Sequence, residues 1–170
     1  MQRSDKVRRL ARLSVLTAMA LALFLVEQLI PLPIALPGVK LGLANLVSLF
    51  AAYAWGRRDA AAILAVRILL GNLVCGTVTA MLYAAAGGLC CGVVLWLLAP
   101  RIPAKQAWVV SILSALAHIL GQMAAAAMLL GSGLVLAYLP VLLLAALATG
   151  AVTGAVTTLV LQRTAPMLKR

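Results

Sequence analysis

The stretch VTAMLYAAAGGLCCGVVLWLL, residues 78–98, carries no charged side chain over its whole length. A transmembrane α-helix needs about 20 predominantly apolar residues to cross the hydrocarbon core of a bilayer. The stretch is long enough for one crossing, and Gly, Pro or charged residues interrupt the chain on either side of it. It is therefore predicted to be a membrane-spanning helix.

The composition of the 170-residue chain extends this prediction to the whole protein. Hydrophobic residues make up 65% of it and charged residues 10%, with a mean hydropathy of +1.15. Soluble domains average about 45–50% apolar and about 25% charged residues. A soluble chain of this size has too little interior to bury so much apolar surface, so lipid must act as its solvent. We predict an all-α integral membrane protein.

Six spans divide the chain, as a single membrane domain without a soluble appendage. Their predicted ranges are 10–30, 41–56, 59–75, 78–98, 105–129 and 134–161. Breaks fall at PLPIALPG (31–38), GRRD (56–59), CGT (75–77), APRIPAK (99–105) and GSG (131–133), where Gly, Pro or charge interrupts the apolar pattern. The basic and apolar N-terminus imitates a signal peptide, but we interpret it as an uncleaved first helix because the rest of the chain is equally apolar.

The distribution of charge orients the six-helix bundle. If the N-terminus is cytoplasmic, twelve of the 14 Lys and Arg residues lie in cytoplasmic segments, the opposite connectors hold only Lys40, and Arg67 lies inside a span. Such asymmetry predicts that both termini are cytoplasmic. The net charge of +11 follows from the same bias. Nucleic-acid binding is not expected, because the chain lacks a solvated basic face with base-stacking aromatic residues.

The stretch AAILAVRILLGNL, residues 60–72, places Arg67 near the middle of a predicted span. A central arginine costs about 2.5–3.5 kcal/mol on insertion, and intramembrane charge marks a functional site by default. Few other polar side chains fall within the spans, and most lie in the outer half. The candidate substrate-binding residues are Arg67, His118, Gln122, Asn45, Lys40, Asn72 and Glu27. They either line a cavity that opens outward or form a polar network that holds the bundle together.

Catalysis is not expected of this chain. It has three carboxylates, two of them cytoplasmic in this topology, so it offers neither a paired-carboxylate site nor the acidic cluster of a Mg²⁺–diphosphate site. No Walker motif occurs. The cysteines form no CxxC motif, and the single His118 has no zinc partners, so no metal or cofactor is predicted.

Small residues point to close helix packing. Ala18 and Ala22 form a small-xxx-small pair on the first span, and Gly150 and Gly154 form another on the last. These pairs either pack inside the bundle or bind a partner helix. The position of the first pair, on a helix that starts with five basic residues, favours a partner there.

Four segments carry a resemblance to a known family: LPIALPGVKLGLANLVSLFAAYAWGRRDA, VRILLGNLVCGT, AAAGGL and AHILGQ. The chain resembles the small six-helix membrane proteins called heptaprenyl diphosphate synthase component I, also known as the Gx transporter family. These are similar to the substrate-binding S components of energy-coupling-factor (ECF) transporters. The resemblance implies a substrate in the outer half of the bundle and an Ala-xxx-Ala motif, matched by Ala18 and Ala22, that docks on a coupling subunit.

Two functions from different classes remain open. In the first, the chain is a non-catalytic S component in a bacterial plasma membrane, which captures a small polar or anionic substrate and relies on separate coupling and ATPase subunits. In the second, it is a membrane accessory component of heptaprenyl diphosphate synthase in isoprenoid or menaquinone synthesis, with a soluble prenyltransferase as partner. A purely structural membrane protein is a third possibility.

Overall fold

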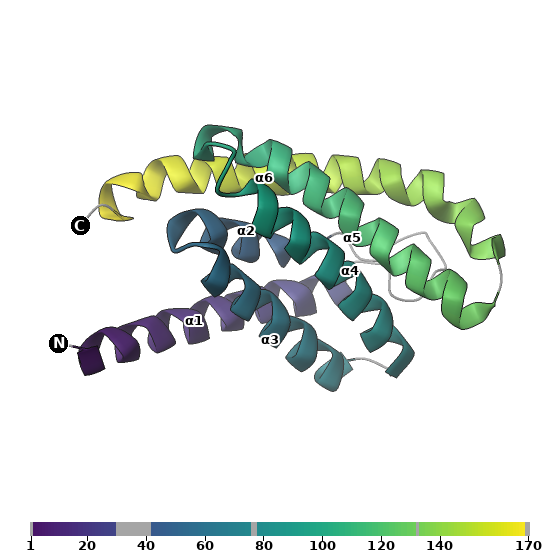
Figure 1. The fold of residues 1–170 in the computed structure, drawn as a ribbon, viewed down its shortest axis with the longest axis horizontal. Helices are drawn as coiled ribbons and strands as arrows, with labels where there is room; N and C mark the ends of the chain where they lie inside the picture. Colours follow the sequence, from purple (N-terminus) through teal and green to yellow (C-terminus); the bar gives the residue numbers. More distant parts are fainter. Residues whose placement is uncertain (1, 30–41, 76–77, 132, 169–170) are drawn as a thin grey trace.

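A computed structural model describes residues 2–29, 42–75, 78–131 and 133–168, and this part of the chain is almost entirely helical (Figure 1). It contains six α-helices and two short 3₁₀ helices, η1 and η2. Their bounds are α1 Gln2–Gln28, α2 Asn45–Ala54, α3 Arg57–Cys75, α4 Val78–Leu98, η1 Ala104–Gln106, α5 Ala107–Leu130, η2 Gly133–Tyr138 and α6 Leu139–Leu168.

Four helical segments among the described residues are long and apolar enough to cross a membrane: Ser4–Glu27, Val78–Leu98, Ala104–Leu130 and Val135–Thr164. A membrane protein with an all-helical fold is therefore confirmed, whereas six separate crossings remain a prediction. The segment predicted at 41–56 contains the shorter helix α2, whose 10 residues extend about 15 Å, half of the roughly 30 Å core. Helix α3 has 19 residues, but its charged side chains lower its hydropathy.

Helices α4, α5 and α6 pack side by side, with α5 between the other two. Glycines allow the close approach. A Cβ atom on Gly154 would lie 2.6 Å from the Cα of Trp108, and one on Gly121 would lie 2.7 Å from the carbonyl oxygen of Ala86. Close backbone approach at small residues is the usual basis of helix association in lipid. The Gly150 and Gly154 pair therefore packs inside the bundle, against α5.

The N-terminal helices form the other part of the bundle. Helix α2 contacts α1, α3 and α6 and so lies between the two groups. Buried apolar residues of α1, α2 and α3 meet in one cluster, which includes Leu16, Val47 and Ile63. At one end of this group, the guanidinium of Arg9 donates two hydrogen bonds to Oδ1 of the buried Asp59, at 2.9 and 2.5 Å, and so joins α1 to α3.

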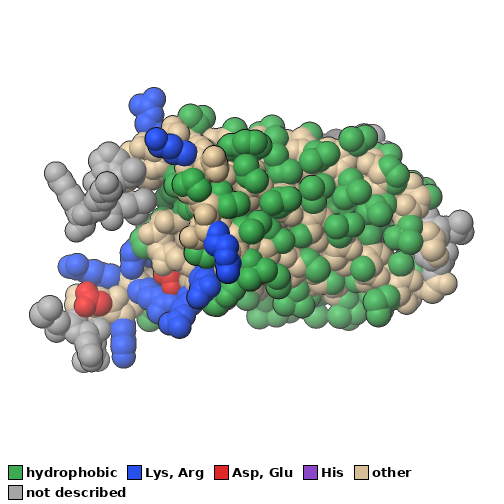
Figure 2. All heavy atoms as spheres, turned by 45° about the horizontal axis from the view of Figure 1, so that its top comes forward, with side chains coloured by type: hydrophobic (Ala, Val, Ile, Leu, Met, Phe, Trp, Pro, Cys, Tyr) green, Lys and Arg blue, Asp and Glu red, His purple; other side chains and the backbone are tan. Residues whose placement is uncertain are grey.

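Basic side chains gather at one end of the molecule. The first turns of α1 and the last turns of α6 lie at the same end (Figure 1). Figure 2 shows Lys and Arg clustered at that end, with hydrophobic side chains covering the rest of the visible face. The exposed basic residues with described side chains are Lys6, Arg8, Arg9, Arg12, Arg57, Arg58, Arg101, Lys105 and Arg163. We call this end the basic end.

Candidate functional site

Arg67 is the central residue of the candidate site. It lies on α3 with only 7% of its surface exposed. Its Nη2 donates a hydrogen bond to Oδ1 of Asn45, the first residue of α2, at 3.0 Å. A buried guanidinium requires such partners, because an uncompensated charge in an apolar interior is strongly destabilising. The contact ties the middle of α3 to the start of α2.

A short chain of hydrogen bonds continues from Asn45 to the end of α1. The backbone N–H of Asn45 donates to the carbonyl of Gly42 at 2.9 Å, and the backbone N–H of Gly42 donates to Oε1 of Glu27. Glu27 is 5% exposed and close enough to Arg67 for the two charges to interact. We call Glu27, Gly42, Asn45 and Arg67 the polar link. It connects the buried carboxylate of Glu27, through Gly42 and Asn45, to the buried guanidinium of Arg67.

Gly42 holds the turn in the polar link. Its φ is +80°, a left-handed conformation that glycine adopts without the steric cost a Cβ would bring. A Cβ atom at this position would also lie 3.2 Å from Nδ2 of Asn45. A larger residue at position 42 would therefore disturb both the turn and the Asn45 side chain.

A small cavity lined by both apolar and polar residues lies beside the polar link. It has a volume of about 20 Å³ and is lined in part by Asn45, Cys91, Ser114 and Thr153, so it can hold one water molecule. The hydroxyl groups of Ser111 and Thr153 lie 3.0 Å apart and hydrogen bond across α5 and α6. Among the described residues, neither Oγ of Ser114 nor Nε of Arg67 has a hydrogen-bond partner. Ser114 lines the cavity, so a water bound there could satisfy its hydroxyl group.

His118 and Gln122 reach the same face of α4 as Arg67, about one turn away. A Cβ atom on Gly87 would lie 2.6 Å from Cγ of Gln122 and 3.0 Å from Cε1 of His118. Arg67 lies near Cys91, four residues after Gly87 on the same helix. Residues four apart lie on one helical face, so the pair on α5 and Arg67 on α3 approach neighbouring turns of α4.

The remaining predicted residues lie apart from this cluster or outside the described part of the chain. Asn72 is buried, and its Nδ2 donates to the carbonyl of Ile68 on its own helix at 2.7 Å. Ala18 and Ala22 are both exposed, and Ala18 lines a groove of about 440 Å³ between α1 and α3. Lys40 falls within 30–41, outside the described residues.

The site has few groups that could hold a metal ion. Among the residues that the structure describes, no group of three or more His, Cys, Asp or Glu side chains is placed to hold a metal ion. Of the three acidic residues in the sequence, Asp59 is paired with Arg9 and Glu27 belongs to the polar link. An aspartate-rich site for a metal–diphosphate complex cannot be assembled from them.

A comparison with protein families identifies the group to which the chain belongs. The family model for heptaprenyl diphosphate synthase component I matches residues 16–160. The chain belongs to this family. Component I is an accessory subunit, as expected for a chain with so few acidic groups. No curated protein and no solved structure matches the component I chain.

Sequence reasoning did not identify two features of this component I chain. Gly42 was not a candidate, although its place three residues before Asn45, ahead of an apolar run, is typical of a turn that leads into a helix. The other feature is a stack between Arg57 and Trp96, whose ring centroid lies 4.5 Å from the guanidinium carbon. An arginine and a tryptophan 39 positions apart give no local signal of such a contact.

Proposed function

We propose that this chain is the membrane-embedded, non-catalytic component of a prenyl diphosphate synthase and works with a separate prenyltransferase subunit. Membership of the component I family carries the proposal. The scarcity of acidic residues supports it, because diphosphate chemistry that depends on Mg²⁺ requires clustered carboxylates. The partner subunit must therefore supply those groups.

The basic end is the proposed docking surface for the prenyltransferase. It faces the cytoplasm in the proposed topology, since Lys and Arg are enriched in cytoplasmic segments. A surface with so many exposed guanidinium and ammonium groups attracts acidic partners and speeds their association. A bacterial plasma membrane is the proposed location, where a soluble enzyme could deliver its apolar product directly into lipid.

Co-purification with a prenyltransferase tests this function. The full chain is coexpressed with a candidate catalytic subunit, and recovery of that subunit in the membrane fraction is measured at low and high salt. We expect recovery that falls at high salt and that weakens in the double variant Arg57→Gln/Arg58→Gln. Met128→Gln, at an exposed position near the other end of the bundle, is the control. A prenyltransferase that stays soluble and makes unchanged products without the chain would contradict the proposal.

Substrate capture as an S component is the second candidate. The buried guanidinium of Arg67 in the polar link favours it, because a bidentate arginine recognises carboxylate or phosphate groups. In this proposal Arg67, Asn45, Glu27, Asn72, His118, Gln122 and Lys40 bind the substrate, and Ala18 and Ala22 dock on a coupling subunit. Co-purification of coupling and ATPase subunits, in place of a prenyltransferase, would favour this candidate. The family description supports the accessory component better.

A further inference from the structure

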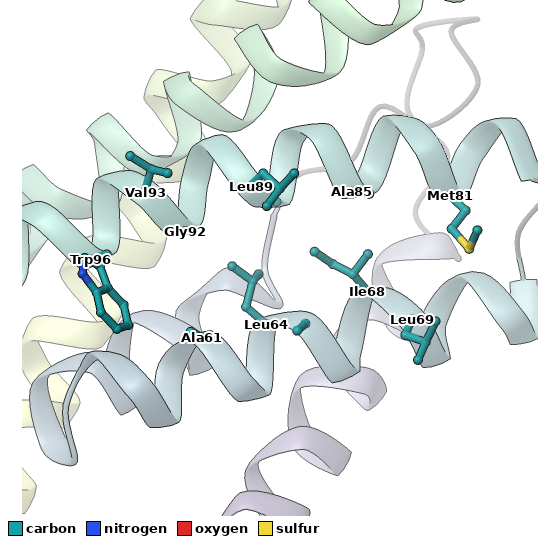
Figure 3. Close-up of a pocket in the computed structure, with 12 residues that line it drawn as sticks. Ala61, Leu64, Ile68, Leu69, Met81, Ala85, Leu89, Gly92, Val93 and Trp96 are labelled. Atoms are coloured by element: carbon teal, nitrogen blue, oxygen red, sulfur yellow. The ribbon is translucent and has the colours of Figure 1, made fainter.

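An apolar groove runs along α3 and α4. Its volume is about 660 Å³, within the range of small-molecule sites. Figure 3 shows the side chains of the two helices that face this space, with Met81 near one end and Trp96 near the other. Trp96 follows Met81 by fifteen positions on α4, so the groove is about 22 Å long at 1.5 Å per residue.

Small residues hollow the groove, and larger apolar ones wall it. Gly88 is buried, and a Cβ atom there would lie 2.1 Å from Cδ1 of Ile68, so Gly88 forms part of the floor. Ala65 is exposed, and so are Leu89 and Val93 on α4. The twelve lining residues include no charged side chain. A single extended hydrocarbon chain fits this shape and chemistry.

Among the residues that the structure describes, positive charge lies at one end of the groove only. Trp96 lines that end, and the guanidinium of Arg57 stacks on its ring. Arg101 lies at the same end, where its guanidinium donates to the carbonyl of Leu97. Both arginines are exposed and belong to the basic end, so they can bind an anion without being buried. Guanidinium groups bind phosphate oxygens in bidentate fashion.

We propose that the groove between α3 and α4 holds the tail of an isoprenoid diphosphate, with the diphosphate at Arg57 and Arg101. Charge complementarity selects this occupant: the groove is apolar along its length and cationic where it meets the basic end. The inference rests on the proposed function, since a prenyltransferase docked at the basic end would release its product beside Arg57. The groove then receives the growing or finished chain as the partner makes it.

Photolabelling of the purified full chain tests the inference. The protein is placed in phosphatidylcholine nanodiscs with a farnesyl diphosphate analogue that carries a benzophenone on its tail. We expect labelled peptides from α3 and α4, and competition by unlabelled isoprenoid diphosphate. The isoprenoid alcohol should compete about tenfold less well, since it lacks the charged contacts. A diacyl phosphatidic acid should compete poorly, because the groove has room for one chain.

Two variants with matched controls test where the hydrocarbon tail and the diphosphate of the ligand bind. Ala65→Phe fills the groove from an exposed position and should abolish labelling, whereas Ala124→Phe, exposed on α5, should not. Arg57→Gln should weaken binding of the diphosphate about tenfold and leave the alcohol unaffected, whereas Arg163→Gln on α6 should change neither. Mapping of the label in the unsubstituted protein keeps the test valid even if a variant misfolds.

Several outcomes would overturn the inference. Equal competition by phosphatidic acid would make the groove an ordinary site for bilayer lipid. Label confined to other helices would exclude the groove, and cross-linking of a second copy at α3 and α4 would make it a protein interface. The proposed function is tested separately, by the co-purification experiment, and it fails if the prenyltransferase is not recovered in the membrane fraction. A chain that recovers the prenyltransferase but takes no label in the groove would leave the function standing and remove only this site.

Discussion

Nη2 of Arg67 lies 3.0 Å from Oδ1 of Asn45, a contact that joins the middle of α3 to the first residue of α2. The two residues are separated by 22 positions in the sequence. With Glu27 and Gly42 they form the polar link. The buried arginine is therefore bonded to a residue of another helix, and that residue is in turn tied through Gly42 to Glu27 on α1.

Loss of Asn45 should destabilise the protein. Asn45→Ala removes a hydrogen bond to a charged group, so we expect the free energy of unfolding to fall by about 1.5–3 kcal/mol. Denaturant unfolding in detergent, followed by tryptophan fluorescence, measures it. Ser48→Ala is the matched control on the same helix: its buried Oγ has no partner among the described residues, and its removal should be nearly neutral. Equal effects of the two substitutions would show that the contact contributes nothing.

Added volume at Gly154 should separate α5 from α6. A Cβ atom there would lie 2.6 Å from the Cα of Trp108, so Gly154→Leu forces the backbones apart and should cost about 1–3 kcal/mol or more. Thermal unfolding in detergent should show a clear loss of stability. The neighbouring Ala155 is exposed, and Ala155→Leu should leave the midpoint almost unchanged. A stable Gly154→Leu protein would contradict the close packing.

The topology can be tested by cysteine labelling in intact cells, starting from a variant with Cys75, Cys90 and Cys91 replaced by alanine. Gly133→Cys should react with an impermeant maleimide added outside, whereas Lys105→Cys should react only after the membrane is permeabilised. The expectation follows from the enrichment of Lys and Arg at the cytoplasmic side. The reverse labelling pattern would show that the bundle has the opposite orientation, with the basic end outside the cell.

Substitution of Ala18 separates a docking surface from an internal contact. Because Ala18 is exposed on α1, Ala18→Phe should change the free energy of unfolding by no more than about 0.5 kcal/mol. If a partner helix packs there, the same substitution should abolish its co-purification. Ala148→Phe, at an exposed position of α6, should affect neither. Failure of the Ala18→Phe protein to fold would show that this residue packs inside the bundle.

The helical membrane class and several helix bounds could be predicted from the sequence. The predicted range 78–98 coincides with α4. A long uncharged run that is bounded by Gly and Pro leaves little choice of where the helix begins and ends. The short α2 was overestimated, since apolar residues before Asn45 extend the pattern although the helix begins only after the turn at Gly42.

The contacts within the candidate site could not be predicted in the same way. Asn45 and Arg67 were both candidates, but no local pattern pairs residues on different helices. Asn72 shows the opposite case. Its side-chain amide donates a hydrogen bond to the carbonyl of Ile68, on the preceding turn of the same helix. The sequence alone does not distinguish a residue that bonds within its helix from one that reaches across.

The order of the polar link along the chain has a consequence for biogenesis. Glu27 and Asn45 both precede Arg67, so the ribosome has already produced them when Arg67 emerges. The guanidinium thus enters the membrane after the Asn45 amide that accepts its hydrogen bond, and this contact does not depend on α4, α5 or α6. A permuted gene that encoded α3 ahead of α1 and α2 would expose the arginine to lipid before its partners existed, and membrane insertion would become the step most sensitive to that charge.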